Sequence, residues 1–314
     1  MKSYGIGVDI GGTTVKIGVF ESDGTLVKTW EIPTRTEDEG SHILGDIALS
    51  VKEKLKEEEI SLEEVKGIGM GVPGPVTEEG LVLKCVNLGW GVFHAAKVMS
   101  DLVGLPVKVG NDANVAALGE MWQGGGKGCD SLVLLTLGTG VGAGIVLNQR
   151  ILTGCSGAAG EVGHMHVNLT ETESCSCGNK GCLEQYTSAT GVVRLMKRYF
   201  ASHQEADSLV NRNKAFSAKD VFDAAREGDK AALCVVEEFG EYLGNALAAL
   251  ACVVNPEAFV IGGGMAAAGD ILMDIVEKNY RNYAFHAVKD AKVLRATLGN
   301  MAGIYGGAKM ALSE

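Results

Sequence analysis

The sequence has few basic residues relative to acidic ones, and it lacks long hydrophobic runs. Its 28 lysines and arginines stand against 39 aspartates and glutamates, giving a formal net charge of −11. This argues against nucleic-acid binding that relies on neutralising many phosphates, because such binding needs clustered basic side chains. The longest apolar run, residues 246–254, is far too short to span a bilayer. No basic segment followed by an apolar one precedes Asp9, so we expect a cytoplasmic protein with no membrane partner.

Cysteine is also sparse, with eight residues in a chain of 314. In a reducing compartment we expect the scattered cysteines to be free and buried. These are Cys85, Cys129, Cys155, Cys234 and Cys252. The other three lie in "CSCGNKGC" at 175–182, where a Cys-x-x-Cys redox motif is absent and Cys-x-Cys is tighter than in common zinc fingers. The cluster therefore favours a metal site over a disulfide, a DNA-reading finger or a redox centre, with a metal-free turn as the remaining alternative.

The remaining composition is that of a globular chain, 46% hydrophobic, long enough for one large or two medium α/β domains. Short β-branched runs alternate with helical periodicity, which predicts α/β architecture. Strands are predicted at 4–8, 15–20, 65–72, 107–111, 131–137, 143–147 and 258–264. One helical face is formed by Ile43, Leu44, Ile47, Val51 and Leu55. The chain from 189 to 255 is predicted to be helical almost throughout, with Ser217 and Asp220 at a helix start.

An internal repeat joins two of the predicted strand-turn-strand segments. "GTTVKIGVF" at 12–20 and "GTGVGAGIV" at 138–146 share Gly, Thr, Val and Gly at the same offsets. Each follows a predicted strand and offers a glycine-rich turn, where N–H groups can converge on an anion because no Cβ blocks the approach and positive φ is accessible. Neither matches GxxxxGK[ST] or a GxGxxG that opens a helix, which disfavours the two commonest nucleotide folds.

The two repeats and a third segment, "IGGGMAAAG" at 261–269, predict a nucleotide site with three glycine-rich strand ends. Asp9 precedes the first turn and would repel a phosphate directly, so we expect it to hold Mg²⁺, which neutralises the phosphates. The third segment leads into a helix whose N-terminus would face the nucleotide. The predicted ATP-site residues are Asp9, Gly11, Gly12, Thr13, Thr14, Lys16, Gly138, Thr139, Gly140, Gly142, Gly262, Gly263 and Gly264.

Four motifs in this order, "DIGGTTVK", "LGTGVGAG", "GCSGAAGEVGH" and "CSCGNKGCLE", resemble the ROK family (repressor, open reading frame, kinase), and most of all its bacterial glucokinases. The resemblance covers about residues 4–311. It implies an actin-like ATPase (ribonuclease H-like) fold with a cleft between two α/β domains, 1–116 plus 303–314 and 117–302. It further implies transfer of a phosphoryl group from Mg-ATP to O6 of D-glucose, and a homodimer, for which 189–255 is a candidate interface.

Phosphoryl transfer to a hydroxyl needs an acceptor for its proton, and "GNDAN" at 110–114 supplies Asp112 where a strand gives way to a helix. Taken alone, Asp112 could equally cap that helix. The resemblance implies that Asp112 is the catalytic base. It also implies a sugar pocket, and polyol recognition does call for acids and amides of fixed geometry. The expected hexose ligands are Gly71, Asn87, Asn111, Asp112, Glu161, His164 and Glu184.

Tetrahedral zinc needs a fourth ligand beside Cys175, Cys177 and Cys182, and His164 and His166 are the nearest upstream imidazoles. The resemblance assigns His164, with His166 as the alternative. Three thiolates and one imidazole close the coordination sphere, so the zinc is expected to be structural and to aim His164 at the sugar.

Other functions are weighed against glucose phosphorylation. A kinase for another hexose or an N-acetylhexosamine is the nearest alternative, and polyphosphate is an alternative donor that the ATP loops disfavour. A sugar-responsive repressor would carry a winged helix-turn-helix ahead of Asp9, where only eight residues stand. An actin-like filament that merely hydrolyses ATP is disfavoured by the acids of the sugar pocket.

Overall fold

The computed structural model describes residues 3–313. The chain divides into two compact units, which are described separately. The first comprises Met1–Asp130, Gly144–Gly160 and Thr297–Glu314, and the second comprises Ser131–Ala143 and Glu161–Ala296. Strand β9 (Val141–Leu147) begins in the second unit and ends in the first. No helix in the described part of the chain is long and apolar enough to cross a membrane.

The first unit is built on a five-stranded sheet of order β3-β2-β1-β4-β7. Its strands are β1 (Tyr4–Ile10), β2 (Thr14–Glu21), β3 (Leu26–Pro33), β4 (Val65–Val72) and β7 (Val107–Asn111). Strands β1, β2 and β3 are antiparallel neighbours, whereas β1, β4 and β7 run parallel. The carboxyl ends of these three parallel strands therefore meet at one edge of the sheet, which is where ligands bind in open α/β sheets.

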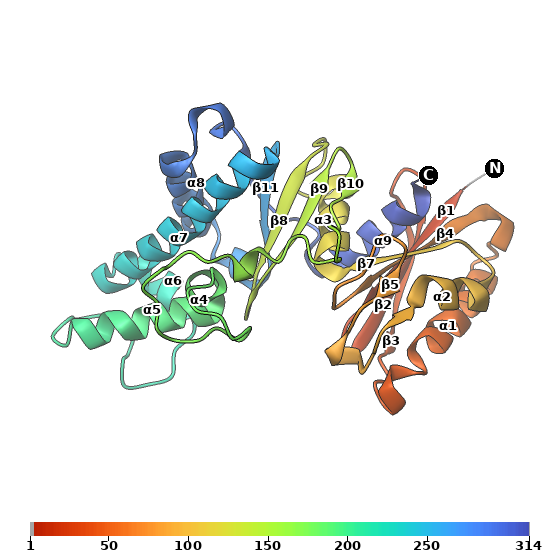
Figure 1. The fold of residues 1–314 in the computed structure, drawn as a ribbon, viewed down its shortest axis with the longest axis horizontal. Helices are drawn as coiled ribbons and strands as arrows, with labels where there is room; N and C mark the ends of the chain where they lie inside the picture. The colour runs from red at the N-terminus through yellow and green to blue at the C-terminus, as the bar shows by residue number, and fades with distance from the viewer. Residues whose placement is uncertain (1–2, 314) are drawn as a thin grey trace. The chain divides into compact units, whose positions relative to one another are not determined.

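Helices cover both faces of this sheet. On one face lie α1 (Ile43–Glu57) and α2 (Ala95–Val103) (Figure 1). They pack on the sheet through a buried cluster that includes Ile6, Val8 and Ile47. The other face carries α9 (Ala302–Leu312), which also packs on α3 (Asp112–Gln123). Because strand side chains alternate between faces, the apolar residues of β1 point to α1 and its glycines point to α9.

Helix α9 lies unusually close to the sheet because the contact is made by glycines. A Cβ at Gly7 in β1 would lie 1.7 Å from the carbonyl oxygen of Ile304, and one at Gly69 in β4 would lie 2.0 Å from that of Gly307. On the other side of α9, a Cβ at Gly306 would lie 1.7 Å from the carbonyl oxygen of Val115 in α3. Larger side chains at these positions would push the helix away from the strand ends that carry the candidate site.

Smaller elements complete the first unit. Strands β5 (Leu81–Val82) and β6 (Phe93–His94) form a short antiparallel pair, and β10 (Arg150–Ile151) pairs with the end of β9. Asn114 of α3 accepts a hydrogen bond from the backbone N–H of Ile145 at 3.3 Å, so this part of β9 is attached to α3.

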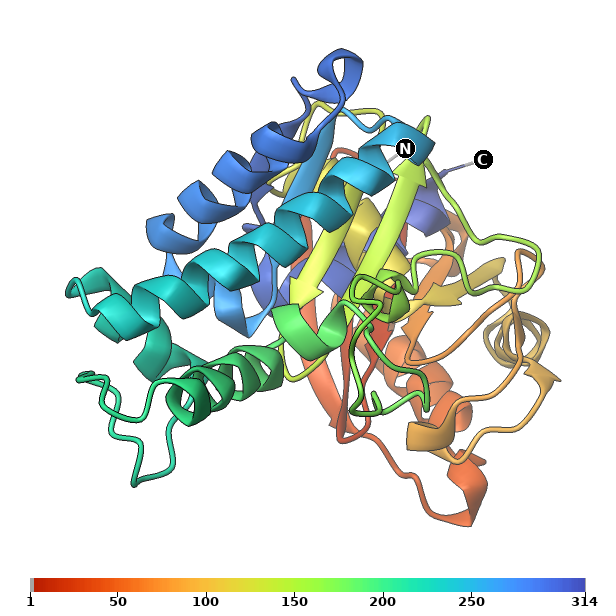
Figure 2. The same ribbon diagram turned by 60° about the vertical axis from the view of Figure 1, so that its left-hand side comes forward.

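The second unit contains the parallel strands β8 (Leu132–Leu137), β11 (Ala258–Gly262) and β12 (Lys292–Arg295), with β11 in the middle. Its helices are α4 (Glu184–Thr187), α5 (Ala189–Ser202), α6 (Ala218–Arg226), α7 (Lys230–Val254) and α8 (Asp270–Tyr283). The long helices α7 and α8 lie side by side in both views (Figures 1 and 2). Ser217 and Asp220 form the capping box that starts α6, as the sequence predicts.

The predicted strands are confirmed within a few residues, but five strands were missed. Strands β5, β6 and β10 have only two residues each, too few to show a periodicity. Strands β3 and β12 are edge strands without a buried side chain, so their hydrophobic pattern is weak. The helical stretch at 189–255 is interrupted by a loop between α5 and α6. The prediction of buried scattered cysteines is confirmed for Cys85 but wrong for Cys155, Cys234 and Cys252, which are exposed, and Cys129 is only partly buried. Cys234 and Cys252 lie on α7 but are not among the residues that this helix buries. Which of its residues are buried depends on the orientation of the helix.

Candidate active site

The acids Asp9 and Asp112 lie at the shared edge of the parallel strands in the first unit. Asp9 is opposite Gly71 in the β1–β4 pair, and Asn111, just before Asp112, is opposite Val72 in the β4–β7 pair. A Cβ at Gly71 would lie 3.5 Å from the Cα of Asp112 and 3.7 Å from Oδ1 of Asp9. The sheet thus brings together two carboxylates and a glycine from three distant sequence segments.

Asp9 is in an environment that disfavours its charge. The pKa of Asp9 is raised to about 6, mainly by burial and also by the negative charge of Asp112, while Lys16 acts in the opposite direction. A half-buried carboxylate next to a second acid, with a pKa that remains raised despite Lys16, is suited to binding a cation. The residues present therefore fit the predicted magnesium site.

Asn111, rather than Asp112, caps helix α3. The side-chain oxygen of Asn111 accepts hydrogen bonds from the N–H groups of Ala113 at 3.0 Å and Asn114 at 3.1 Å. Asp112 is the first residue of the helix, and its Oδ1 accepts a hydrogen bond from the Ala113 N–H at 2.8 Å. The Asn111 amide also donates to the carbonyl of Gly74 at 3.3 Å, which ties the cap to the segment after β4.

The first glycine turn, Gly11 to Thr14, connects β1 and β2. Gly12, Thr13 and Thr14 are exposed, and no atom lies within 4 Å of a Cβ built at Gly12. Thr34 fixes the turn, because its hydroxyl donates to the carbonyl of Gly11 at 2.7 Å and its N–H donates to that of Thr13 at 2.9 Å. The turn therefore presents an open backbone in a fixed conformation.

Two other predicted residues of the first unit lie near this edge. Lys16 is opposite Asp9 in the β1–β2 pair, and its ammonium group donates to the carbonyl of Asn300 at 3.1 Å. Asn87 is exposed in a 3₁₀ turn at Val86–Leu88. Burial raises the pKa of the nearby Cys85 thiol, and the charge of Asp112 acts in the same direction. The Cys85 thiol donates to the carbonyl of Pro73 at 2.8 Å, so this loop starts beside the end of β4.

In the second unit, two of the glycine segments line one cavity. The turn after β8 contains Gly138, Thr139 and Gly140, with Gly142 following in β9. Gly138, Thr139 and Gly264 are among the residues that line a cavity of about 420 Å³. The sequence predicts a strand at 258–264 and a following helix. In the structure the strand β11 already ends at Gly262, and a 3₁₀ helix at Gly264–Ala268 precedes α8. The cavity has the size of a small-molecule site.

The glycines of the first two turns act by lacking a side chain, since Gly11, Gly12, Gly138 and Gly140 do not adopt positive φ. In the third segment Gly263 does, with φ 81°, and a Cβ there would lie 2.5 Å from the carbonyl oxygen of Leu137. This position accepts glycine alone on both grounds.

The three clustered cysteines and His164 converge. One ligand atom from each of His164, Cys175, Cys177 and Cys182 lies within 4.8 Å of the others. The sulfur atoms of Cys177 and Cys182 are 3.7 Å apart, and Cys175 Sγ is 3.9 Å from Nδ1 of His164. Zinc–sulfur bonds of about 2.3 Å in a tetrahedron place two sulfurs about 3.8 Å apart, so the thiols are spaced for zinc rather than for a disulfide. His166 is not part of this group.

The thiols of the cluster differ in their surroundings. The pKa of Cys182 is raised to about 12, mainly by burial and also by the neighbouring Cys177 and Cys175. A hydrogen bond from the Asn179 backbone lowers the pKa of the exposed Cys177. A bound cation would stabilise all three thiolates.

Glu161 and Glu184, the two predicted sugar acids of this unit, differ in their partners. Glu161 precedes the 3₁₀ turn Val162–His164 and is exposed. Glu184 opens α4, and its Oε2 accepts a hydrogen bond from the Val141 N–H at 2.9 Å. Its Oε1 accepts one from the Ser176 hydroxyl at 3.1 Å.

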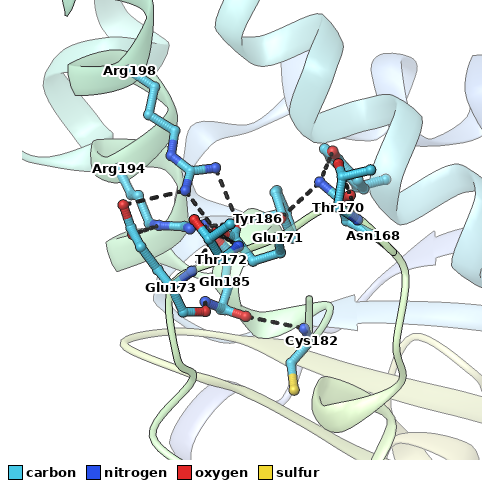
Figure 3. A network of polar contacts seen from close by, with 11 residues as sticks. Asn168, Thr170, Glu171, Thr172, Glu173, Cys182, Gln185, Tyr186, Arg194 and Arg198 are labelled. Carbon is cyan, nitrogen blue, oxygen red and sulfur yellow. Dashed lines mark hydrogen bonds and ion pairs between the residues drawn. The ribbon is translucent and has the colours of Figure 1, made fainter. Parts of the chain in front are cut away.

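Sequence reasoning missed a buried polar network behind the cysteine loop (Figure 3). The Glu171 side chain, 1% exposed, accepts hydrogen bonds from Arg194 at 2.5 Å, from Arg198 at 2.9 and 3.0 Å, and from the Tyr186 hydroxyl. The hydrogen bond from Arg198 lowers the pKa of Glu171, and burial raises it. The hydrogen bonds to Glu171 outweigh burial, so its pKa lies far below the usual range. The i, i+4 spacing of the two arginines was the one available signal, but it does not identify a partner more than twenty residues away.

The comparisons with known proteins agree with this architecture. The ROK family model matches residues 5–314, and the chain belongs to the ROK family. It is 44% identical to a glucokinase of Halalkalibacterium halodurans, over 96% of this chain and 93% of that one.

Two solved structures are similar over nearly all of both chains. A ROK family glucokinase from Streptomyces griseus, in complex with glucose and AMPPNP, is 34% identical with a TM-score of 0.72, covering 98% of this chain and 99% of that one. A ROK hexokinase from Thermus thermophilus is 30% identical with a TM-score of 0.80, covering 98% and 97%. The predicted actin-like ATPase fold of this family is confirmed.

Proposed function

We propose that this protein is a glucokinase, which transfers the γ-phosphoryl group of ATP to O6 of D-glucose. The observation that carries the proposal is the identity of 44% to a glucokinase along almost the full length of both chains. The pair of acids at the edge of the parallel strands supports it, since one carboxylate is suited to a cation and the other to a proton.

Asp112 acts as the general base. It lies at the first position of α3, where Asn111 accepts hydrogen bonds from the N–H groups of Ala113 and Asn114, and Asp112 Oδ1 shares the Ala113 N–H. It takes the proton of O6 as that oxygen attacks the γ-phosphorus and the bond from this phosphorus to the departing ADP breaks. The in-line arrangement of acceptor and donor supplies most of the rate.

Asp9 binds Mg-ATP through the cation. Magnesium, when bound, neutralises the charge of the phosphates. The backbone of Gly11, Gly12, Thr13 and Thr14, and the segments containing Gly138, Thr139, Gly140, Gly142 and Gly262–Gly264, hold the nucleotide, with Lys16 beside Asp9.

The hexose hydroxyls are bound by Glu161, His164 and Glu184 and by Gly71, Asn87 and Asn111. His164 has a second role as a zinc ligand with Cys175, Cys177 and Cys182. Zinc, when bound, is structural and fixes the tautomer and direction of the His164 ring. The sulfur spacing of 3.7 Å supports this assignment.

A substrate panel with ADP detection tests the proposed activity. We expect the highest kcat/KM with glucose, and more efficient turnover of N-acetylmannosamine, fructose or allose would contradict the assignment. Glucose-independent ATP hydrolysis would favour an ATPase scaffold instead. Polyphosphate as a better donor than ATP would contradict the nucleotide part of the proposal.

Three further predictions belong to this proposal. The domain division at 1–116 plus 303–314 and 117–302 stays a prediction that limited proteolysis can test. A homodimer, with the helices of 189–255 as the candidate interface, is tested by light scattering. The cytoplasmic location also stays a prediction.

A further inference from the structure

Glu184 connects two segments that the proposed function assigns to different substrates. Its Oε2 accepts the hydrogen bond from Val141 N–H, directly after the glycine turn proposed for the nucleotide. Its Oε1 accepts from Ser176 and lies 3.8 Å from Cys175 Sγ, in the cysteine loop proposed for the sugar side. One half-buried carboxylate thus contacts both segments within the second unit.

The glycine turn is shaped to receive this carboxylate. A Cβ at Gly140 would lie 2.3 Å from Oε2 of Glu184, whereas no atom lies within 4 Å of one at Gly138. The missing side chain at Gly140 therefore permits the Glu184 contact. The Val141 N–H is oriented by a charge-assisted hydrogen bond, which is stronger than one between neutral groups.

The first residues of α5, the helix that follows α4 in the chain, also form hydrogen bonds to this turn. The N–H of Ala189 donates to the carbonyl of Gly138 at 2.7 Å, and the Thr190 hydroxyl donates to that of Thr139 at 2.9 Å. Together with the bond to Val141, α4 and α5 contact three residues of the segment from Gly138 to Val141. Glu184 supplies the only charged group among these contacts in the described residues.

Helix α4 is itself fixed to the cysteine loop. The Cys182 N–H donates to Oε1 of Gln185 at 3.1 Å, and the Gln185 amide donates to the carbonyl of Glu173 at 3.0 Å (Figure 3). Arg194 of α5 donates to the Gln185 carbonyl at 3.2 Å. The backbone that carries Glu184 is therefore held firmly enough to set the position of a partner.

We propose that Glu184 is a positioning residue for the nucleotide-binding turn at Gly138–Val141, in addition to binding a hexose hydroxyl. The proposal rests on the proposed function of this turn. A carboxylate has about four acceptor sites, so it can keep the Val141 N–H while a sugar hydroxyl binds. The turn then has its binding conformation before sugar is present, and its affinity for nucleotide depends on Glu184 without sugar.

The test measures the affinity for AMPPNP with Mg²⁺ and without sugar, by isothermal titration calorimetry. Glu184→Ala should weaken AMPPNP binding about tenfold, the usual size of one hydrogen bond to a charged group. Glu184→Gln keeps an acceptor for Val141 and should recover most of this affinity. Glu161→Gln removes the charge of the other proposed sugar acid, which does not contact the turn, and should leave AMPPNP affinity at the wild-type value while glucose affinity falls.

Unchanged AMPPNP affinity in Glu184→Ala, alongside weaker glucose binding, would overturn this inference and leave the proposed function standing. A wild-type protein that binds no AMPPNP would overturn both. If Glu184→Ala loses thermal stability, Glu184→Asp replaces it, because its shorter side chain keeps the charge but not the reach to Val141. Hydrogen exchange of the Val141 amide gives an independent readout and should be faster in Glu184→Asp.

Discussion

The backbone of Gly303, in the first turn of α9, packs directly against the side chain of Asp9. A Cβ at Gly303 would lie 2.6 Å from Cγ and 2.7 Å from Oδ2 of Asp9, closer than real Cβ atoms approach other atoms. The position of the proposed cation ligand is therefore set by the helix as well as by its strand.

Gly303→Ala should displace Asp9 or α9 and lower both the melting temperature and the affinity for Mg-AMPPNP. Such overpacking costs about 1–3 kcal/mol. Gly45→Ala is the matched control, because Gly45 is exposed within α1 and nothing lies within 4 Å of a Cβ there. It should stabilise the protein by about 0.5–1 kcal/mol through helix propensity. Equal changes in melting temperature for the two variants would contradict the direct packing of Gly303 on Asp9.

Asp9→Asn should stabilise the ligand-free protein while abolishing activity. The folded-state pKa of Asp9, about 6, exceeds the ordinary value of 3.8, so ionisation opposes folding above pH 3.8. The gain in free energy of unfolding should grow between those two values and stay constant above, at about 1–3 kcal/mol. Urea unfolding at several pH values without Mg²⁺ measures it. A variant less stable than the wild type at pH 8 would argue against the raised pKa.

Asp112→Ala should lower kcat by about 10²–10⁴-fold and leave glucose affinity near that of the wild type, since general-base catalysis has this magnitude. Single-turnover kinetics and glucose titration separate the two effects. Asp101→Ala, which removes an exposed acid of α2 paired with Lys97, should leave both unchanged. Near-normal turnover of Asp112→Ala would remove Asp112 as the base.

Cys177→Ser should release zinc, measured by elemental analysis, and weaken glucose binding more than AMPPNP binding. The Cys177 side chain is exposed, so the substitution creates no cavity, and its effect acts through the metal and His164. Cys155→Ser, exposed and outside the cluster, should retain the metal. Equal loss of affinity for both substrates would indicate general unfolding instead.

Glu171→Ala should destabilise the protein by about 3–5 kcal/mol, because it leaves the guanidinium groups of Arg194 and Arg198 without their buried partner. Glu173→Ala, whose side chain is 61% exposed, should cost less than about 1 kcal/mol. Because the folded-state pKa of Glu171 is lowered, its contribution is complete above the unfolded value of 4.5 and decreases as the pH falls below it. Urea unfolding of each variant at pH 7 and pH 3.5 should show a smaller Glu171 effect at the lower pH.

The sequence by itself determined the α/β class, most strands, the glycine turns and the residue types of the site. These features are local, because strand periodicity, strand-end glycines and the Asn111–Asp112 junction depend on neighbouring residues. The family motifs and their order could also be recognised from the sequence. The exposure of Cys234 and Cys252 could not be predicted, since either face of a hydrophobic helix can point outward.

The tertiary structure decided the contacts between distant segments. It placed His164 rather than His166 with the three cysteines. It packed Gly303 on Asp9, joined Glu171 to Arg198 and directed Glu184 to Val141. Each of these contacts joins residues whose separation in sequence carries no information about their separation in space. They arise only when packing fixes the direction of each side chain, which local propensity does not specify.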